Sequence, residues 1–191
     1  MELRDYVRIL HKNWILLLVL LFAGLAGGII YAILQPAKYE ATTQMYVSVR
    51  SEGAGTGDMV QGTNFARQMV ASYVDVIGTA LVLDPVIDDL DLDLSVGELQ
   101  GFVSATNPLN TVMILVTVVN SDPITAASIA NSTAESFATA VQSTLERPAT
   151  PEGVSPVQVT VVQPATVPTK PFSPNGPLIV VVAGILGLAL G

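Results

Sequence analysis

The chain has 191 residues, of which half are hydrophobic and 13% are charged, and its formal net charge is −8. An acidic chain without a basic stripe to neutralise phosphates does not fit nucleic acid as a partner. Cysteine is absent, which excludes disulfide bonds and thiolate metal sites. Because the mean hydropathy is +0.56 despite the acidic excess, the apolar residues must be concentrated in blocks.

The first apolar block covers residues 14–34, which are 21 residues without a charge. A helix of this length rises roughly 31 Å, close to the hydrocarbon thickness of a bilayer, about 30 Å. A cleaved signal peptide is the alternative, but the block exceeds the usual core of about 7–15 residues and lacks a small-x-small cleavage pattern. The block predicts a first transmembrane helix, in which Gly24 and Gly28 have the G-x-x-x-G spacing that allows close helix packing.

The charges on either side of this block predict its orientation. The head, residues 1–13, has a net charge of +1 with His11 neutral, whereas residues 35–177 carry five basic against 14 acidic residues. Lysine and arginine beside a transmembrane helix favour the cytoplasmic side. We therefore expect a cytoplasmic head, with His11 at the membrane interface, and an extracytoplasmic domain over residues 35–163.

The domain begins with a strand over residues 39–49, where apolar and polar residues alternate. The face expected to be buried holds Tyr39, Ala41, Thr43, Met45, Val47 and Val49. A glycine-rich loop follows at residues 51–58. A helix is then predicted over residues 64–83, because Phe65, Met69, Tyr73 and Ile77 recur at every fourth position.

Residues 84–94 predict a short helix and an acidic turn, after which Ser95 and Glu98 have capping-box spacing for another short helix. Two strands are expected within residues 101–107 and 111–120. Asn107, Pro108 and Asn110 mark the loop between them.

Asp122 as N-cap and Pro123 at the first helical position predict a long helix over residues 122–147. Its apolar stripe is Ala126, Ala130, Ala134, Phe137, Val141 and Leu145. A last strand lies within residues 156–165. The order is the split βαββαβ arrangement apart from the inserted short helices, so we predict an α+β, ferredoxin-like domain with a mostly antiparallel sheet, helices on one face, and a transmembrane helix at either end.

A proline-rich segment, residues 164–177, follows this strand and predicts a semi-rigid strut. Its prolines are Pro164, Pro168, Pro171, Pro174 and Pro177. The uncharged block after it, residues 178–191, would rise only about 21 Å as a helix, so it is either a buried core helix or the start of a second transmembrane helix, truncated at the end of the chain. The expected topology favours the second interpretation, which places both termini in the cytoplasm. Gly187 and Gly191 again have the G-x-x-x-G spacing.

The sequence contains only weak motifs for catalysis or for the binding of a metal or nucleotide. Asp89, Asp91 and Asp93 are spaced like the opening of an EF-hand, but Leu94 and Gln100 occupy the positions that need Gly and Glu, so a solvated turn is favoured. The outer domain has neither His nor Cys, which excludes Ser-His-Asp and Cys-His catalysis, and no Walker-type nucleotide loop occurs. We expect no catalytic, cofactor-binding or metal-binding residue. The glycosylation sequon at Asn131 falls inside the long predicted helix and carries little weight.

In this order the predicted elements and motifs resemble those of the Wzz-type chain-length determinants, also called polysaccharide co-polymerases. The resemblance runs from the head "ELRDYVRILHKNW" through "YEATTQMYV" to a dP-x-x-A-x-x-I-A-N pattern. That pattern is matched by Asp122, Pro123, Ala126, Ile129, Ala130 and Asn131. The resemblance also covers the proline-rich segment, with Ser173 and Asn175 among its prolines, and the second apolar block with Gly187 and Gly191.

The resemblance implies a multi-pass protein of the cytoplasmic membrane that self-associates into rings and regulates the chain length and export of a surface polysaccharide, a capsule or an exopolysaccharide, without being an enzyme. The implied partners are further copies of the chain, the polysaccharide polymerase, the growing polymer, the lipid bilayer and a cytoplasmic tyrosine kinase, fused or separate, as in the compact type of the family. Two alternatives remain. The chain could be the membrane or sensor part of a tyrosine kinase whose catalytic domain lies beyond residue 191, or a sensor or adhesin ectodomain.

Overall fold

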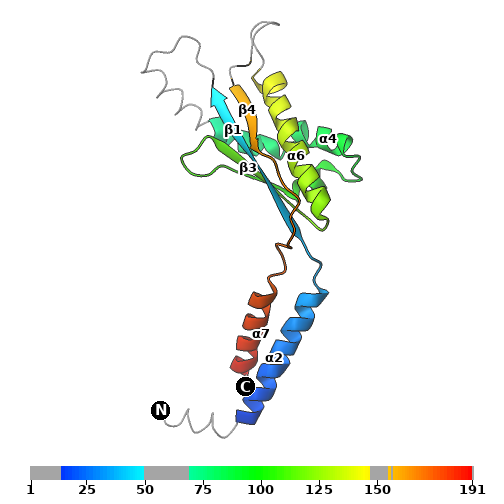
Figure 1. Ribbon diagram of the computed structural model, residues 1–191, viewed down its shortest axis with the longest axis vertical. Coiled ribbons are helices and arrows are strands. Elements are labelled where there is room, and N and C mark those ends of the chain that lie inside the picture. The colour runs from blue at the N-terminus through cyan, green and yellow to red at the C-terminus, as the bar shows by residue number, and fades with distance from the viewer. Residues whose placement is uncertain (1–13, 50–68, 147–154, 156, 191) are drawn as a thin grey trace. The chain divides into compact units, whose positions relative to one another are not determined.

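The computed structural model describes residues 14–49, 69–146, 155 and 157–190, and it divides into two units (Figure 1). The helix unit comprises Met1–Lys38 and Pro171–Gly191, and the sheet unit is Tyr39–Lys170. The predicted head, the loop at 51–58, Phe65 and Gly191 lie outside the described residues.

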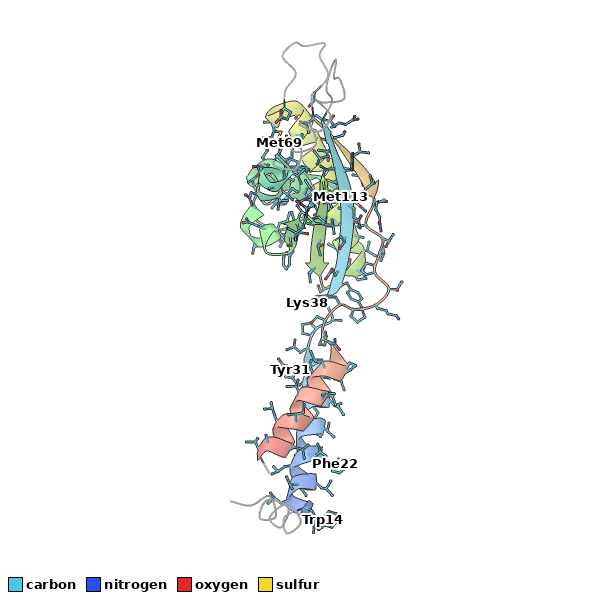
Figure 2. All side chains as sticks on the ribbon, turned by 90° about the vertical axis from the view of Figure 1, so that its left-hand side faces the viewer. Trp14, Phe22, Tyr31, Lys38, Met69 and Met113 are labelled. Atoms are coloured by element: carbon cyan, nitrogen blue, oxygen red, sulfur yellow. The ribbon has the colours of Figure 1, made fainter. Side chains whose placement is uncertain are left out.

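Two apolar helices form the described part of the helix unit. Helix α2 spans Trp14–Leu34, the same 21 residues as the first apolar block, and Figure 2 shows Trp14 at one end of it, Phe22 along it and Tyr31 near the other end. Among the described residues, α2 is the single unbroken helix long and apolar enough to cross a membrane. Helix α7, Gly176–Leu190, has 15 residues and begins one residue before Pro177. Proline is tolerated in that first turn because the amide there has no helical partner.

The described part of the sheet unit contains four strands in the order β2-β3-β1-β4. They span Tyr39–Val49 (β1), Val103–Thr106 (β2), Met113–Asn120 (β3) and Val157–Gln163 (β4). Every neighbouring pair is antiparallel, with Met45 opposite Ile114 in β3 and Val47 opposite Val159 in β4. The prediction of a mixed α+β domain with an antiparallel sheet is therefore confirmed.

The helices of the sheet unit gather on one face of the sheet (Figures 1 and 2). They are the helix Met69–Ile77, α4 (Ala80–Asp89), α5 (Val96–Gln100), α6 (Pro123–Ala140) and the π-helix η1 (Val141–Leu145). Along β1 the predicted inward residues Ala41, Thr43, Met45 and Val47 are buried, and the intervening residues are not. Alternation therefore predicted the face of β1 that packs on these helices.

Both predicted caps are confirmed. The Ser95 hydroxyl accepts from the Glu98 amide while the Glu98 carboxylate accepts from the Ser95 amide at 2.8 Å, which is a complete capping box at the start of α5. The Asp122 carboxylate accepts from the Thr125 amide at 2.7 Å and from its hydroxyl at 2.6 Å. These signals act over three residues, so they could be predicted locally.

The continuous helix predicted over 64–83 is wrong. The described part ends at Ile77, and α4 begins at Ala80 after a bend of 47°. Thr79 has extended backbone angles, φ −91° and ψ 162°, and its hydroxyl donates to the Val76 carbonyl at 2.6 Å. This side-chain bond competes with helical pairing, which is why threonine favours a helix boundary. The predicted stripe holds within the described residues, because Tyr73 and Ile77 are buried.

The predicted apolar stripe of the long helix is also wrong at its last residue, Leu145. From Ala126 to Val141 its members are buried, but Leu145 is 38% exposed. The chain leaves α-helical geometry after Ala140, and in η1 the Glu146 amide donates to the Val141 carbonyl, five residues back. The wider turn rotates Leu145 out of the stripe.

Candidate functional site

Glycines allow α2 and α7 to approach closely within the helix unit. A Cβ at Gly24 would lie 2.5 Å from the Ala183 carbonyl oxygen and 3.2 Å from the Cα of Gly187. A Cβ at Gly28 would lie 2.7 Å from the Ala183 Cβ, and one at Gly187 would lie 2.5 Å from the Leu20 carbonyl oxygen. Only hydrogen fits at these positions, so the predicted packing residues Gly24, Gly28 and Gly187 lie at the contact between the two helices.

Gly27 differs from its neighbour Gly28. A Cβ at Gly27 would meet nothing within 4 Å. Both glycines line an open apolar groove of about 630 Å³ on the helix pair, together with Leu20, Tyr31 and Leu178. None of the described residues that line this groove is charged.

Backbone hydrogen bonds hold the end of the proline-rich segment within the helix unit. The Lys38 amide donates to the Ser173 carbonyl at 2.8 Å, and the Lys38 carbonyl accepts from the amides of Phe172, at 2.8 Å, and Ser173, at 3.3 Å. Lys38 and Ser173 thus form an isolated antiparallel bridge just before α7. The next residues, Pro174 and Asn175, lead into the helix, where the Asn175 carbonyl accepts from the Ile179 amide at 3.1 Å. The Ser173–Pro174 peptide bond is cis.

The start of the proline-rich segment is held within the sheet unit by a side chain of α6. Asn131 Nδ2 donates to the Ala165 carbonyl at 3.0 Å, and the Ala165 amide donates to Asn131 Oδ1 at 2.8 Å. Ala165 is only 8% exposed, although Pro164 before it is exposed. The segment is therefore attached near both ends, by Asn131 at Ala165 and by Lys38 at Phe172 and Ser173.

Between these attachments, residues 166–171 form no hydrogen bond with any other described residue. Pro171 is exposed and Pro168 is half-buried. Pro168 and Pro171 have fixed φ and no amide donor, and the chain bends at residues 169–170 between them. Pro177 lies beyond it in the first turn of α7.

The ionisable groups of the sheet unit stabilise its fold. The Tyr73 hydroxyl donates to Glu146 Oε1 at 3.0 Å, and its ring packs edge-on against Phe137 at 5.9 Å. Burial raises the pKa of Tyr73, and the hydrogen bond to Glu146 raises it further. Hydrogen bonds from the Ser95 hydroxyl and amide lower the pKa of Glu98, and hydrogen bonds from the Thr125 hydroxyl and amide lower the pKa of Asp122. Asp89, the first aspartate of the EF-hand-like spacing, accepts from the Ser132 hydroxyl at 3.1 Å, and no group of three His, Cys, Asp or Glu residues within the described ranges could hold a metal ion.

Sequence reasoning missed three of these residues. Ala183 and Gly187 have small-xxx-small spacing, which could have identified Ala183 as a contact residue of α7. Asn131 was noted only for its sequon and its motif, although asparagine is a poor helix former and its place inside a helix is itself a signal of a side-chain contact. Nothing local indicates that Lys38 pairs with Ser173, 135 positions later in the chain.

Comparison with known proteins identifies the family to which this chain belongs. The family model described as chain length determinant protein, Wzz, matches residues 1–90. Over 181 residues the chain is 30% identical to the capsular polysaccharide biosynthesis protein CpsC from Streptococcus pneumoniae, covering 91% of this chain and 74% of that protein. The chain belongs to the Wzz chain length determinant family.

Two staphylococcal proteins are also similar to this chain. The capsular polysaccharide type 8 biosynthesis protein cap8A from Staphylococcus aureus is 30% identical over 71% of this chain and 61% of its own length. The capsular polysaccharide biosynthesis protein CapA from Staphylococcus aureus strain COL is 28% identical over 72% of this chain and 62% of its own length. The chain thus spans about three fifths of the length of these two relatives and about three quarters of that of CpsC.

Proposed function

We propose that this chain is a membrane-anchored regulator of the chain length and export of a surface polysaccharide, a capsule or an exopolysaccharide. The observation that carries the proposal is the similarity to a capsular polysaccharide biosynthesis protein along 91% of this chain, together with the match to the chain length determinant model. The anchoring helix is α2, which is free of charge over 21 residues. The protein makes and breaks no bond, and acts through the position of its sheet unit.

The proposed topology has two transmembrane helices. The head at 1–13 is cytoplasmic, 14–34 is the first span, 35–163 is the outer domain, 164–177 is the strut and 178–191 starts the second span, so that both termini are cytoplasmic. The close glycine contacts between α2 and α7 support a second span, since an apolar helix paired with a transmembrane helix is best accommodated in the same bilayer.

We further propose a ferredoxin-like fold for the sheet unit. The strand order β2-β3-β1-β4 with antiparallel neighbours supports it, as does the sequence of elements along the chain. The helix Met69–Ile77, α4 and α5 occupy the place of the first crossover helix, and α6 is the second.

The proposed partners are those of a co-polymerase. Copies of this chain would form a ring around or beside the polymerase and the growing polymer, within the lipid bilayer, and a cytoplasmic tyrosine kinase, fused or separate, would act on the inner side. The acidic outer domain supports the absence of nucleic acid among these partners.

Deletion and complementation test the function. The gene is deleted in the source organism, the chain is restored from a plasmid, and extracted polysaccharide is profiled by size on a gel. We expect polymer still to be made without the chain but with an altered length distribution that complementation restores. An unchanged distribution would contradict length control, and a complete loss of sugar linkages would favour an enzyme instead.

Cysteine labelling tests the topology. Because the chain has no cysteine, Ser51→Cys supplies a unique thiol in the proposed outer domain. An impermeant thiol reagent should label it on intact cells, whereas His11→Cys in the proposed cytoplasmic head should be labelled only after permeabilisation. The reverse pattern would invert the orientation.

The alternative function, the membrane part of a tyrosine kinase, makes a different prediction. In that case deletion of this chain would abolish tyrosine autophosphorylation of the kinase, measured in membrane extracts. A catalytically inactive kinase would then alter the polymer length distribution as much as deletion of the chain does. Under the proposed function, deletion of this chain alters the polymer length distribution more than inactivation of the kinase does.

A further inference from the structure

We propose that Asn131 is a positioning residue. Its side-chain amide determines where the proline-rich segment leaves the sheet unit, and control of polymer length depends on that fixed point. The length-control part of this inference rests on the proposed function, whereas the attachment itself stands on the geometry of the sheet unit alone.

The need for such a residue follows from the end of β4. The strand pairs with β1 up to Gln163, opposite Gln44. The next residue, Pro164, has no amide, so the ladder cannot continue through it. Ala165 then turns its side chain into the core, which leaves its own amide and carbonyl without a strand partner. Unpaired backbone groups at a buried position are unfavourable.

Asn131 supplies both missing partners at once. A primary amide has a donor and an acceptor side by side, the same pair that a neighbouring strand would offer. The two hydrogen bonds, 3.0 Å and 2.8 Å, hold the peptide groups of Ala165 against α6 across 34 positions of sequence. Because α6 also packs on the sheet, the attachment joins the segment to the most buried part of the unit.

The attachment at Ala165 affects the direction of the residues that follow it. Beyond Ala165, residues 166–171 have no hydrogen bond to any other described residue, and the next attachment is at Phe172 and Ser173. Residues 166–168 run without a bend until the chain turns at residues 169–170, so the direction in which they leave the sheet unit depends on how Ala165 is held. Loss of the Asn131 bonds would free that residue while the sheet stays paired.

Two substitutions at Asn131 and one matched control separate positioning from stability. Asn131→Ala removes both bonds, and alanine favours the helix. Asn131→Asp keeps the shape and the acceptor but sets a carboxylate against the Ala165 carbonyl. The control is Asn107→Ala, because Asn107 Nδ2 also donates to two backbone carbonyls, Met113 at 2.6 Å and Thr111 at 3.2 Å, and both lie in the connection between β2 and β3 or at the start of β3.

The full-length chain in nanodiscs gives the first readout. Hydrogen exchange at the Ala165 amide should become about five- to tenfold faster in Asn131→Ala and stay unchanged in Asn107→Ala. Equal exchange in the wild type and Asn131→Ala would overturn the attachment, whatever the function of the protein.

The second readout is the polymer length distribution after complementation with each variant at matched expression. We expect both Asn131 variants to shift the distribution and Asn107→Ala to restore the wild-type profile. Faster exchange at Ala165 with a wild-type length profile would overturn the role of the fixed point but leave the proposed function, which the deletion tests separately. Equal length shifts in Asn107→Ala and Asn131→Ala would reduce Asn131 to a stabilising residue.

Discussion

In the helix unit the backbones of glycines touch and the large side chains point outward, whereas in the sheet unit the large side chains touch each other. Gly28 is the buried residue of α2, and Ile15, Phe22 and Ile33 are exposed. In the sheet unit Phe137, Met45 and Ile77 are fully buried. Burial of apolar side chains away from water lowers the free energy of the folded protein, whereas burial away from lipid does not. Helices in lipid therefore associate through close contacts between small residues.

The difference teaches that the two units should fail under opposite changes. Removing volume should break the sheet unit, because it leaves a cavity in a packed core. Adding volume should break the helix pair, because the nearest atoms of the other helix are backbone atoms or the Ala183 Cβ, which cannot rotate aside. The predictions below test this contrast, beginning with the largest expected effect.

Phe137→Ala should lower the free energy of unfolding of the sheet unit by about 3–5 kcal/mol, because the ring is fully buried and packs edge-on against Tyr73. Urea unfolding of the full chain in detergent, followed by circular dichroism, measures it. Ile124→Ala on the same helix is the control, since Ile124 is 63% exposed and should change stability by no more than about 0.5 kcal/mol. Equal effects at the two positions would overturn the assigned core.

Gly28→Leu should separate α2 from α7, at an overpacking cost of about 1–3 kcal/mol, because a Cβ there would lie 2.7 Å from the Ala183 Cβ. Gly27→Leu should be tolerated, because its Cβ would meet nothing within 4 Å. A disulfide between Leu25→Cys and Gly184→Cys reports the contact in a chain without other cysteines. Crosslinking should be lost in Gly28→Leu and kept in Gly27→Leu, and the same yield in both would contradict the glycine contact.

Acid should weaken the sheet unit and leave the helix pair unaffected, because α2 and α7 contain no ionisable acid. The pKa of Asp122 is lowered by the hydrogen bonds from Thr125. The stabilisation from a lowered pKa is complete above the ordinary value, 3.8, and is lost as the pH falls through the folded value.

Asp122→Asn tests this dependence, because asparagine also caps a helix but does not titrate. The difference in urea midpoint between about pH 7 and about pH 3 should be smaller in Asp122→Asn than in the wild type. An unchanged difference would assign the acid sensitivity to other carboxylates.

The smallest effect is expected at Leu145. Since η1 turns this residue out of the core, Leu145→Ala should change the free energy of unfolding by no more than about 0.5 kcal/mol. Val141→Ala, one position in the stripe earlier, should cost more because Val141 is fully buried. The reverse order in the same urea measurement would restore the continuous α-helical stripe.

Local signals predicted a large part of the fold. Alternation predicted the bounds and the buried face of β1, and spacings of three residues predicted the caps of α5 and α6. The break at Thr79 and the π-turn after Ala140 could not be predicted in this way. Both occur inside sequences whose apolar spacing suits a continuous α-helix, and the periodicity of apolar residues does not report side-chain bonds such as that of Thr79 to the Val76 carbonyl.

The sequence by itself determined which blocks are apolar, where the charges lie and which residues of β1 and of most of α6 are buried, because these follow from composition and period. Only the tertiary structure decided what each buried face meets. Gly27 and Gly28 are identical neighbours, yet a Cβ at Gly27 would meet nothing within 4 Å, whereas one at Gly28 would lie 2.7 Å from the Ala183 Cβ. Asn131 meets Ala165 across 34 positions. Periodicity describes one element at a time, whereas a contact between two elements depends on how both are placed.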